Sequence, residues 1–362
     1  MGKAVFLSIL GVFCALSAPA DDATKARVAR YFTQWYSVCP GTKVTVTAMP
    51  EVVIPGYDAY RAERACELKN RNESSITLVD KAGKEIFVGQ VLHDDNRRDR
   101  PFVAATDLPV FRGALQDMYG LPVNLAVGQG QRGSLVPLVV RILEAPNAVA
   151  SVGGFASQDG ASILVGEFFP LDVEPDVTRA KLLAAPGPPA AAKKSVFSVT
   201  AFIDFQCERC RVRTPQVRTF AWAHGGEVQV RFLPLVKIHN WAFAAAECAA
   251  ALSAVSPPLY SKYEDAIFPR AGEMDETSAR DVAADVAQAA GVSDAYVAEL
   301  SSGRARKRVL EDIELGLRLG LNGTPVFFYR GAWLSSEPEL AENFIQKGLE
   351  EAAKPADKGA AR

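Results

Sequence analysis

The sequence is organised around one stretch, Phe202-Ile203-Asp204-Phe205-Gln206-Cys207-Glu208-Arg209-Cys210-Arg211. An apolar run over residues 196–205 predicts a buried strand, and the amphipathic run after it predicts a helix that begins at the two cysteines. A sulfur at a helix N-terminus faces unpaired backbone N–H groups and the positive end of the helix dipole, which favour the thiolate. Because thiolates attack disulfides, we expect Cys207 to be the exposed nucleophile and Cys210, one turn deeper, to resolve the mixed disulfide.

Two other interpretations of the Cys-x-x-Cys pair are a zinc knuckle and a static disulfide. Zinc normally needs two further soft ligands, but the chain has no second Cys-x-x-Cys and only three histidines, none spaced as a pair. A disulfide across two residues closes a small loop and limits little chain entropy. Strand, Cys-x-x-Cys and helix together favour a redox pair that uses no metal and no organic cofactor.

Composition limits the remaining possibilities. The chain has 362 residues, 49% of them hydrophobic and 23% charged, which is enough globular material for two or three domains. The formal net charge is −2 and no long basic run is present, so nucleic acid is not an expected partner.

Residues 1–20 have the pattern of a cleavable secretory signal. One lysine precedes an apolar core over residues 4–16, and Ala18-Pro19-Ala20 stands before two aspartates. The alternative is an uncleaved anchor, but this core is short for a bilayer span. We therefore expect cleavage after Ala20, loss of Cys14, and a periplasmic or otherwise exported protein.

The remaining cysteines are interpreted from that compartment, because disulfides persist in an oxidising environment. Cys39 and Cys66 fall in one N-terminal region and are expected to pair, although two unpaired core thiols are the alternative. Cys248 lies in a helical run of small residues and is expected to be a buried packing residue without chemistry.

The N-terminal half shows the same plan twice. In each pass a helical pattern is followed by a strand and later by a hairpin. These elements are predicted over residues 23–37, 44–47, 76–79 and 85–88, and then over 111–119, 123–127, 136–143, 150–155 and 163–165. The segment 83–89 aligns with 160–166, with its glycines, isoleucine and valine in the same order. We interpret residues 21–98 and 99–172 as a tandem duplication, against chance likeness of two hairpins.

The second half begins after a linker over residues 173–194. A short helix follows Pro175, and the proline-rich run 184–194 predicts a semi-rigid extended spacer. The predicted C-terminal domain, residues 195–353, contains the cysteine motif, a strand at 228–233, helical pattern over about 240–320, and a strand that opens after Gly323-Thr324-Pro325. Residues 354–362 are small and charged, and are expected to be a disordered tail.

Residues from about 196 to 352 resemble DsbA-like thiol–disulfide oxidoreductases of the thioredoxin superfamily. The motif strand with its two cysteines, the Gly323-Thr324-Pro325 segment and the long helical insert between them carry this resemblance. It implies an α/β thioredoxin fold in which Pro325 is cis, lies beside the redox pair and, with Thr324, binds the extended chain of the substrate. Without the resemblance, Pro325 is also compatible with an ordinary strand start.

The chain departs from that family's pattern around the cysteines. Glu208 and Arg209 stand between them, where many relatives have proline and an aromatic residue or histidine; Arg209 should favour the Cys207 thiolate and Glu208 should oppose it. Ala201 stands where some relatives bury a carboxylate. Asp204 is the nearest acid, and the proton relay for Cys210 is open between it and His239, whose favoured interpretation is capping of the next helix or exposure.

The N-terminal half resembles, over a short segment at residues 76–89, the cystatin-like dimerisation domain of DsbC-type disulfide isomerases. This implies an α+β half made of two such units, which in one chain can pair edge to edge. We therefore expect a monomer, with a groove lined by apolar side chains between this half and the catalytic domain.

The sequence thus predicts a periplasmic thiol–disulfide oxidoreductase, an oxidase or isomerase, that acts on cysteine-containing exported proteins and is recycled by a membrane redox partner. The alternative is a non-catalytic substrate-binding or chaperone-like protein in which Cys207 and Cys210 form a structural disulfide. The direction of exchange depends on the reduction potential, which the sequence does not determine.

Overall fold

The computed structural model describes residues 22–36, 41–66, 71–94, 96, 101–184, 195–334 and 338–353. The predicted signal segment, Cys39, the proline-rich spacer and the C-terminal tail lie outside the described residues. Within the described ranges, no helix combines the length and apolarity that a membrane span requires.

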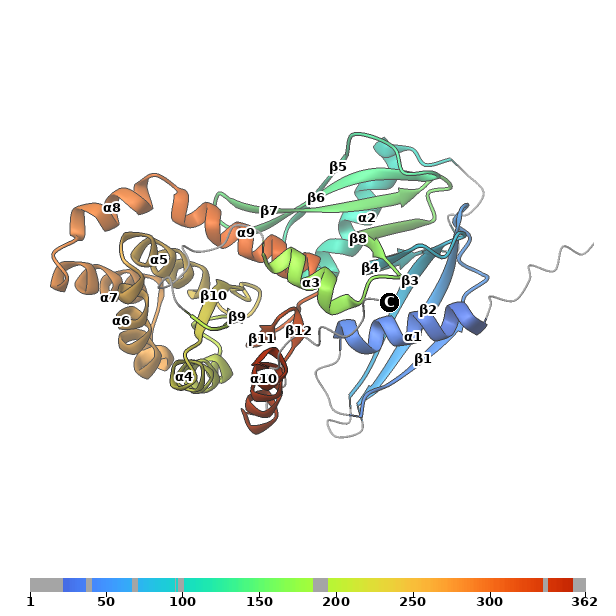
Figure 1. Ribbon diagram of the computed structural model, residues 1–362. Coiled ribbons are helices and arrows are strands. Elements are labelled where there is room, and N and C mark those ends of the chain that lie inside the picture. Colours follow the sequence, from blue (N-terminus) through green and yellow to red (C-terminus); the bar gives the residue numbers. More distant parts are fainter. Residues whose placement is uncertain are drawn as a thin grey trace, which may run out of the picture.

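The N-terminal half consists of one large antiparallel sheet with two helices (Figure 1). Its elements are α1 (Asp22–Tyr36), β1 (Lys43–Ala48), β2 (Tyr57–Cys66), β3 (Arg71–Asp80), β4 (Glu85–His93), α2 (Ala104–Tyr119), β5 (Val123–Val127), β6 (Leu135–Ala145), β7 (Ala148–Ser157) and β8 (Ser162–Pro170). The strand order is β1-β2-β3-β4-β8-β7-β6-β5. Each half of the sheet therefore follows its own helix, and the two last strands, β4 and β8, join the halves.

The junction of the two halves lies at a pair of glycines. Gly89 of β4 pairs with Gly166 of β8, and both have positive φ angles, +154° and +147°. A Cβ atom on Gly89 would collide with the carbonyl oxygen of Val165, and one on Gly166 with that of Val88. Strand β7 begins at residue 148, 77 residues after the start of β3 at 71, and β8 begins at 162, 77 residues after the start of β4 at 85. Gly166 is therefore the counterpart of Gly89 in the repeat, and the two face each other.

The two helices cover their own halves of the sheet. The apolar face of α1, with Val28, Phe32 and Trp35, packs on β1 and β2 in one core cluster. Phe111 and Leu115 of α2 pack on β5 and β6 in a second cluster. The spacing of buried residues three and four apart accounts for both helices, as predicted. Whether these units are cystatin-like stays a prediction.

Strand β2 was not expected from the sequence. Its residues Tyr57-Asp58-Ala59-Tyr60-Arg61-Ala62-Glu63-Arg64-Ala65-Cys66 carry four charges and three alanines, which have low strand propensity. The strand forms because it is paired along its whole length with β3 and along most of its length with β1. Pairing on both edges thus outweighs the weak local preference.

Helix α3 (Pro175–Leu183) ties the two halves of the molecule together within the predicted linker. Arg179 is fully buried and donates hydrogen bonds to the carbonyl oxygens of Trp35 in α1 and Gly331 at the start of β12, and it forms an ion pair with Asp176. The first part of the linker is therefore a packed helix. Figure 1 shows α3 and α9 between the large sheet and the smaller one.

The C-terminal half contains a second sheet and most of the helices. Its elements are β9 (Ser198–Ile203), α4 (Glu208–Ala223), β10 (Glu227–Phe232), α5 (Ala242–Val255), α6 (Pro257–Ile267), the 3₁₀ helix η3 (Phe268–Glu273), α7 (Glu276–Ala289), α8 (Ser293–Ser301), α9 (Arg304–Arg318), β11 (Val326–Tyr329), β12 (Ala332–Trp333) and α10 (Pro338–Ala353). The strand order is β10-β9-β11-β12, with β10 parallel to β9 and the other pairs antiparallel. Helices α5 to α9 form the predicted insert between β10 and β11.

Candidate active site

Cys207 lies where the central strand β9 passes into helix α4. The strand residues Val199 to Ile203 are buried because β9 pairs on both edges, with β10 and β11. Cys207 is the N-cap residue of α4, with extended φ and ψ of −76° and 117°, and no side chain caps the helix. The first N–H groups of α4 therefore point toward the Cys207 sulfur, as the sequence predicted.

The Cys207 sulfur is in surroundings that stabilise a thiolate. Its pKa is lowered to about 5, first by a hydrogen bond from the Cys210 side chain, against an opposing effect of burial. Backbone N–H groups of Cys210 and Arg209 and the side chain of Thr324 lower it further. The Thr324 hydroxyl is buried without another partner among the described residues, so it is available to the thiolate.

Cys210 has the opposite environment. It is fully buried, and burial, followed by the hydrogen bond it donates to Cys207, raises its pKa well above the ordinary value. The backbone N–H of Asp204 points to its sulfur at 3.4 Å. The two cysteines are thus a half-buried low-pKa thiol and a fully buried high-pKa thiol, both free in this structure. This is the electrostatic division that a nucleophile and a resolving thiol require.

The structure brings Thr324 and Pro325 to the same place, 117 residues further along the chain. The Thr324–Pro325 peptide bond is cis, and the Thr324 carbonyl oxygen lies 3.4 Å from the Cys207 sulfur. Pro325 directly precedes β11, which pairs with β9, and this pairing holds the loop against the start of α4.

Asp204 forms a buried network that the sequence did not predict. Its carboxylate accepts N–H groups of Gln206 and Leu235 and the Nδ1 of His239, each at 2.7 Å. The interpretation of His239 as a helix cap or an exposed residue is wrong, because its ring is only 17% exposed and contacts Asp204. Helix α5 begins after Trp241 and has no side-chain cap.

This network positions the motif rather than touching a sulfur directly. These three hydrogen-bond donors come from the motif loop and from the segment after β10, so Asp204 joins these two parts of the chain. Its backbone N–H is thereby held toward Cys210. The only sequence signal was an acid at the end of a buried strand, three residues before the first cysteine.

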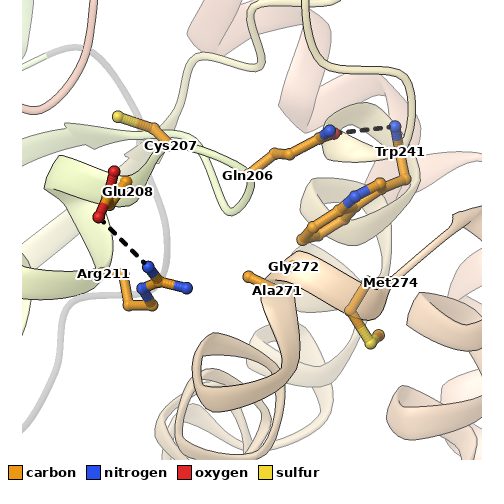
Figure 2. A pocket seen from close by; sticks show the side chains of 8 residues that line it. All are labelled: Gln206, Cys207, Glu208, Arg211, Trp241, Ala271, Gly272 and Met274. Carbon is orange, nitrogen blue, oxygen red and sulfur yellow. Dashed lines mark hydrogen bonds and ion pairs between the residues drawn. The ribbon is translucent and has the colours of Figure 1, made fainter.

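A cavity of about 420 Å³ opens beside Cys207. Figure 2 shows Glu208 and Arg211 of α4 on one side, and Trp241 with Met274 on the other, while Cys207 lies at the rim. Gln206 accepts a hydrogen bond from the backbone N–H of Trp241, which links the motif loop to the start of α5. Ala271 and Gly272 complete the lining. Cys207 therefore borders a space that can hold residues of another chain.

Comparison with known proteins identifies the domain in which this site lies. Residues 198–346 match the family model described as the DSBA-like thioredoxin domain. These residues form a DSBA-like thioredoxin domain. No curated protein matches the chain.

Solved structures resemble about half of the chain. The thiol-disulfide exchange protein alpha-DsbA2 from Wolbachia pipientis is 17% identical over 49% of this chain and 94% of its own, with a TM-score of 0.41. The catalytic domain of Proteus mirabilis ScsC is 16% identical over 48% and 96%, with a TM-score of 0.40. A thioredoxin-like oxidoreductase from Silicibacter pomeroyi is 20% identical over 49% and 98%, with a TM-score of 0.38.

The remaining predicted site residues lie at the edge of the DSBA-like domain's site or outside it. Glu208 and Arg209 are exposed, and Glu208 lies 3.7 Å from Arg211. Arg209 helps to lower the pKa of Cys207 through a hydrogen bond from its backbone N–H; its side chain is not among the largest causes. Cys66 is disulfide-bonded. Because Cys39 lies outside the described residues, its pairing with Cys66 stays a prediction.

In the described part of the DSBA-like domain, neither a metal site nor a third reactive thiol accompanies Cys207 and Cys210. No group of three or more His, Cys, Asp or Glu side chains within the described residues is arranged to hold a metal ion. Cys248 is fully buried in α5, and burial raises its pKa to about 11. A thiol of that kind is inert at neutral pH.

The N-terminal sheet contacts the DSBA-like domain near the loop that carries Thr324. Arg318 at the end of α9 forms an ion pair with Glu167 of β8 at 2.6 Å, and the Leu319 carbonyl accepts a hydrogen bond from the Trp35 indole. A cavity of about 300 Å³ lies in this junction, lined by both halves, with Tyr36 and Leu317 among its residues. This cavity is small, and its lining is both apolar and polar.

Proposed function

We propose that this protein exchanges disulfides with cysteine-containing exported proteins through Cys207 and Cys210. The observation that carries the proposal is the contrast between the two sulfurs: the pKa of Cys207 is lowered to about 5, and that of buried Cys210 is raised. A structural disulfide has no need of a stabilised thiolate at its more accessible sulfur. The match of residues 198–346 to the DSBA-like domain supports the same chemistry.

The exchange proceeds in two balanced steps from the disulfide form. A deprotonated substrate thiol attacks the Cys207 sulfur, the Cys207–Cys210 bond breaks, and Cys210 leaves as a thiolate that takes up a proton because its buried site disfavours charge. A second substrate thiolate then attacks the substrate sulfur of the mixed disulfide. Cys207 leaves as a thiolate, and the substrate is oxidised to a disulfide while the protein gains two electrons.

The low pKa of Cys207 favours this direction. A low-pKa thiol is the better leaving group, so the mixed disulfide breaks toward release of Cys207. Stabilisation of the reduced protein also raises the reduction potential of the pair. We therefore propose disulfide donation or isomerisation, and a membrane redox partner that reoxidises the pair.

The substrate chain is proposed to lie over Thr324 and Pro325. The Thr324 carbonyl oxygen is 3.4 Å from the Cys207 sulfur, so a substrate cysteine joined to Cys207 brings its own backbone beside this residue. The neighbouring cavity, with Trp241 and Met274, is large enough for flanking side chains. No sequence-specific contact is required for a protein that acts on many substrates.

The duplicated N-terminal half is proposed to replace a second subunit. Strands β4 and β8, the last strand of each unit, lie at the centre of the sheet and pair with each other within one chain along nine residue pairs. Their N–H and C=O groups are therefore not available to another molecule. We propose a monomer with one redox site, exported by the predicted signal at residues 1–20.

The reduction potential tests the redox function. Equilibration of the purified protein with glutathione buffers should give a reduction potential above about −230 mV, whereas a structural disulfide has a reduction potential below about −300 mV. Cys210→Ser should trap a cysteine-containing substrate on Cys207, and Cys248→Ser is the matched control that should leave exchange unchanged. A potential below the structural limit, or substrate trapped on Cys248, would overturn the proposal.

A further inference from the structure

A second cavity lies on the DSBA-like domain away from the cysteine motif, at the edge of its sheet. It has a volume of about 550 Å³ and is lined by β10, by the end of α4, by the start of α6 and by α9. None of the cysteines contributes to its lining. The redox chemistry leaves it without a role.

The floor of this cavity is an unpaired strand edge. Strand β10 pairs only with β9 among the described strands. The N–H groups of Glu227 and Leu233 point to β9, so the alternate residues Val228 and Val230 direct their N–H and C=O groups outward. The next outward N–H, that of Phe232, is covered by Asp312 of α9.

The outward groups of Val228 and Val230 have no hydrogen-bond partner among the described residues. Both residues line the cavity. A row of this kind is a template for pairing with another extended chain. At most edges of globular proteins a charge, a proline or a covering segment prevents this, but here the two residues are valines.

The walls of the cavity complement an extended peptide. Trp222 of α4 is 61% exposed, and Pro258 and Tyr260 of α6 also line the cavity. Arg218 stacks near the ring of Tyr260, with its guanidinium carbon 5.5 Å from the ring centre, and is ion-paired with Glu264 through one nitrogen. Arg218 is only 8% exposed, and its other terminal nitrogen, Nη2, is buried without a hydrogen-bond partner among the described residues.

We propose that this edge binds an extended peptide segment of a partner protein, which adds a strand to β10. Its backbone pairs with Val228 and Val230, apolar side chains at alternate positions lie against Trp222 and Tyr260, and a carboxylate accepts the free Nη2 donor of Arg218. Arg308, which also lines the cavity and has an unpartnered buried Nε, adds a second positive charge for an acidic residue. This peptide need not contain cysteine, so the site is independent of Cys207.

A cysteine-free peptide tests the proposal separately from the redox function. The probe is a fluorescein-labelled peptide of alternating valine and threonine with an aspartate at each end, titrated with the purified protein and followed by fluorescence anisotropy. We expect saturable binding that Cys207→Ser does not change. Replacement of both aspartates by asparagine should weaken binding severalfold.

Backbone pairing is tested with two N-methylated forms of the same peptide, which need no protein variant. In one form the alternate amides that face β10 are methylated, and in the other form the remaining amides are methylated. The form methylated at the amides that face β10 should bind at least tenfold more weakly than the parent peptide, and the other form should bind as the parent does. Equal affinity of the two forms, or no saturable binding, would overturn the proposal.

A protein variant and amide exchange locate the site. Val228→Pro removes an outward N–H but no bond to β9, which an edge strand tolerates, and should weaken peptide binding at least tenfold while disulfide exchange through Cys207 is retained. Hydrogen exchange at Val228 and Val230 should be fast in the free protein and slow with peptide. If these amides are already protected without peptide, another segment covers the edge and the proposal falls.

Discussion

Replacement of Cys210 by alanine or by serine separates the two sources of thiolate stabilisation at Cys207. The hydrogen bond from the Cys210 side chain is the largest contribution to the lowered pKa of Cys207. Serine keeps an O–H donor at this position, while alanine removes it. The backbone N–H groups at the start of α4 are the same in both variants, so the pair isolates the side-chain donor.

The size of the effect follows from the strength of a hydrogen bond to a charged group. Such a bond contributes about 1.5–3 kcal/mol, which corresponds to about one to two pKa units. Since Cys207 is only half-buried, water screens part of this energy, and the lower end is expected. Cys210→Ala should therefore raise the Cys207 pKa from about 5 by about one unit. Cys210→Ser should leave it nearly unchanged.

The assay is the pH dependence of alkylation by iodoacetamide, supported by the ultraviolet absorbance of the thiolate. Cys248 does not interfere, because burial raises its pKa to about 11, and Cys66 is disulfide-bonded. If Cys210→Ala titrates at the same pH as the parent protein, the backbone N–H groups alone stabilise the thiolate, and the role assigned to the Cys210 side chain is refuted.

Three further outcomes are expected. The reduced protein should be more stable to heat than the oxidised one at neutral pH, because the folded-state pKa of Cys207 lies below the ordinary thiol value. This difference in stability is fully present above about pH 8.5 and should be lost as the pH falls through about 5. A difference that does not change with pH would contradict the prediction. Gly166→Ala should lower the free energy of unfolding in urea by about 2–4 kcal/mol, because the new Cβ collides with the Val88 carbonyl oxygen at a positive φ. Gly153→Ala is the control, because no backbone atom lies nearer than 3.9 Å to its new Cβ. Equal losses of stability in the two variants would argue against the close approach at Gly166. Light scattering should show a monomer with one titratable redox pair per particle, whereas a stable dimer at micromolar concentration would show that another edge still associates.

Local patterns were sufficient wherever the signal lies within one segment. The strand β9, the helix α4 and the position of Cys207 at its first turn follow from an apolar run, two cysteines and an amphipathic run. The repeat of helix and strands in the first half could be read from aligned glycines. Strand β2 could not be predicted in this way, because its charged residues and alanines obscure the alternation of apolar and polar residues. It is a strand because it pairs with β1 on one edge and β3 on the other.

The sequence by itself predicted the two cysteines that we propose carry the chemistry and most of the helices and strands, because thiolate stabilisation at a helix start and hydrophobic periodicity are local properties. Only the tertiary structure decided that Gly89 meets Gly166, that His239 reaches Asp204, and that β10 pairs along one edge only among the described strands. These contacts join residues far apart in the chain. They depend on strand order and on close packing, which no single segment encodes.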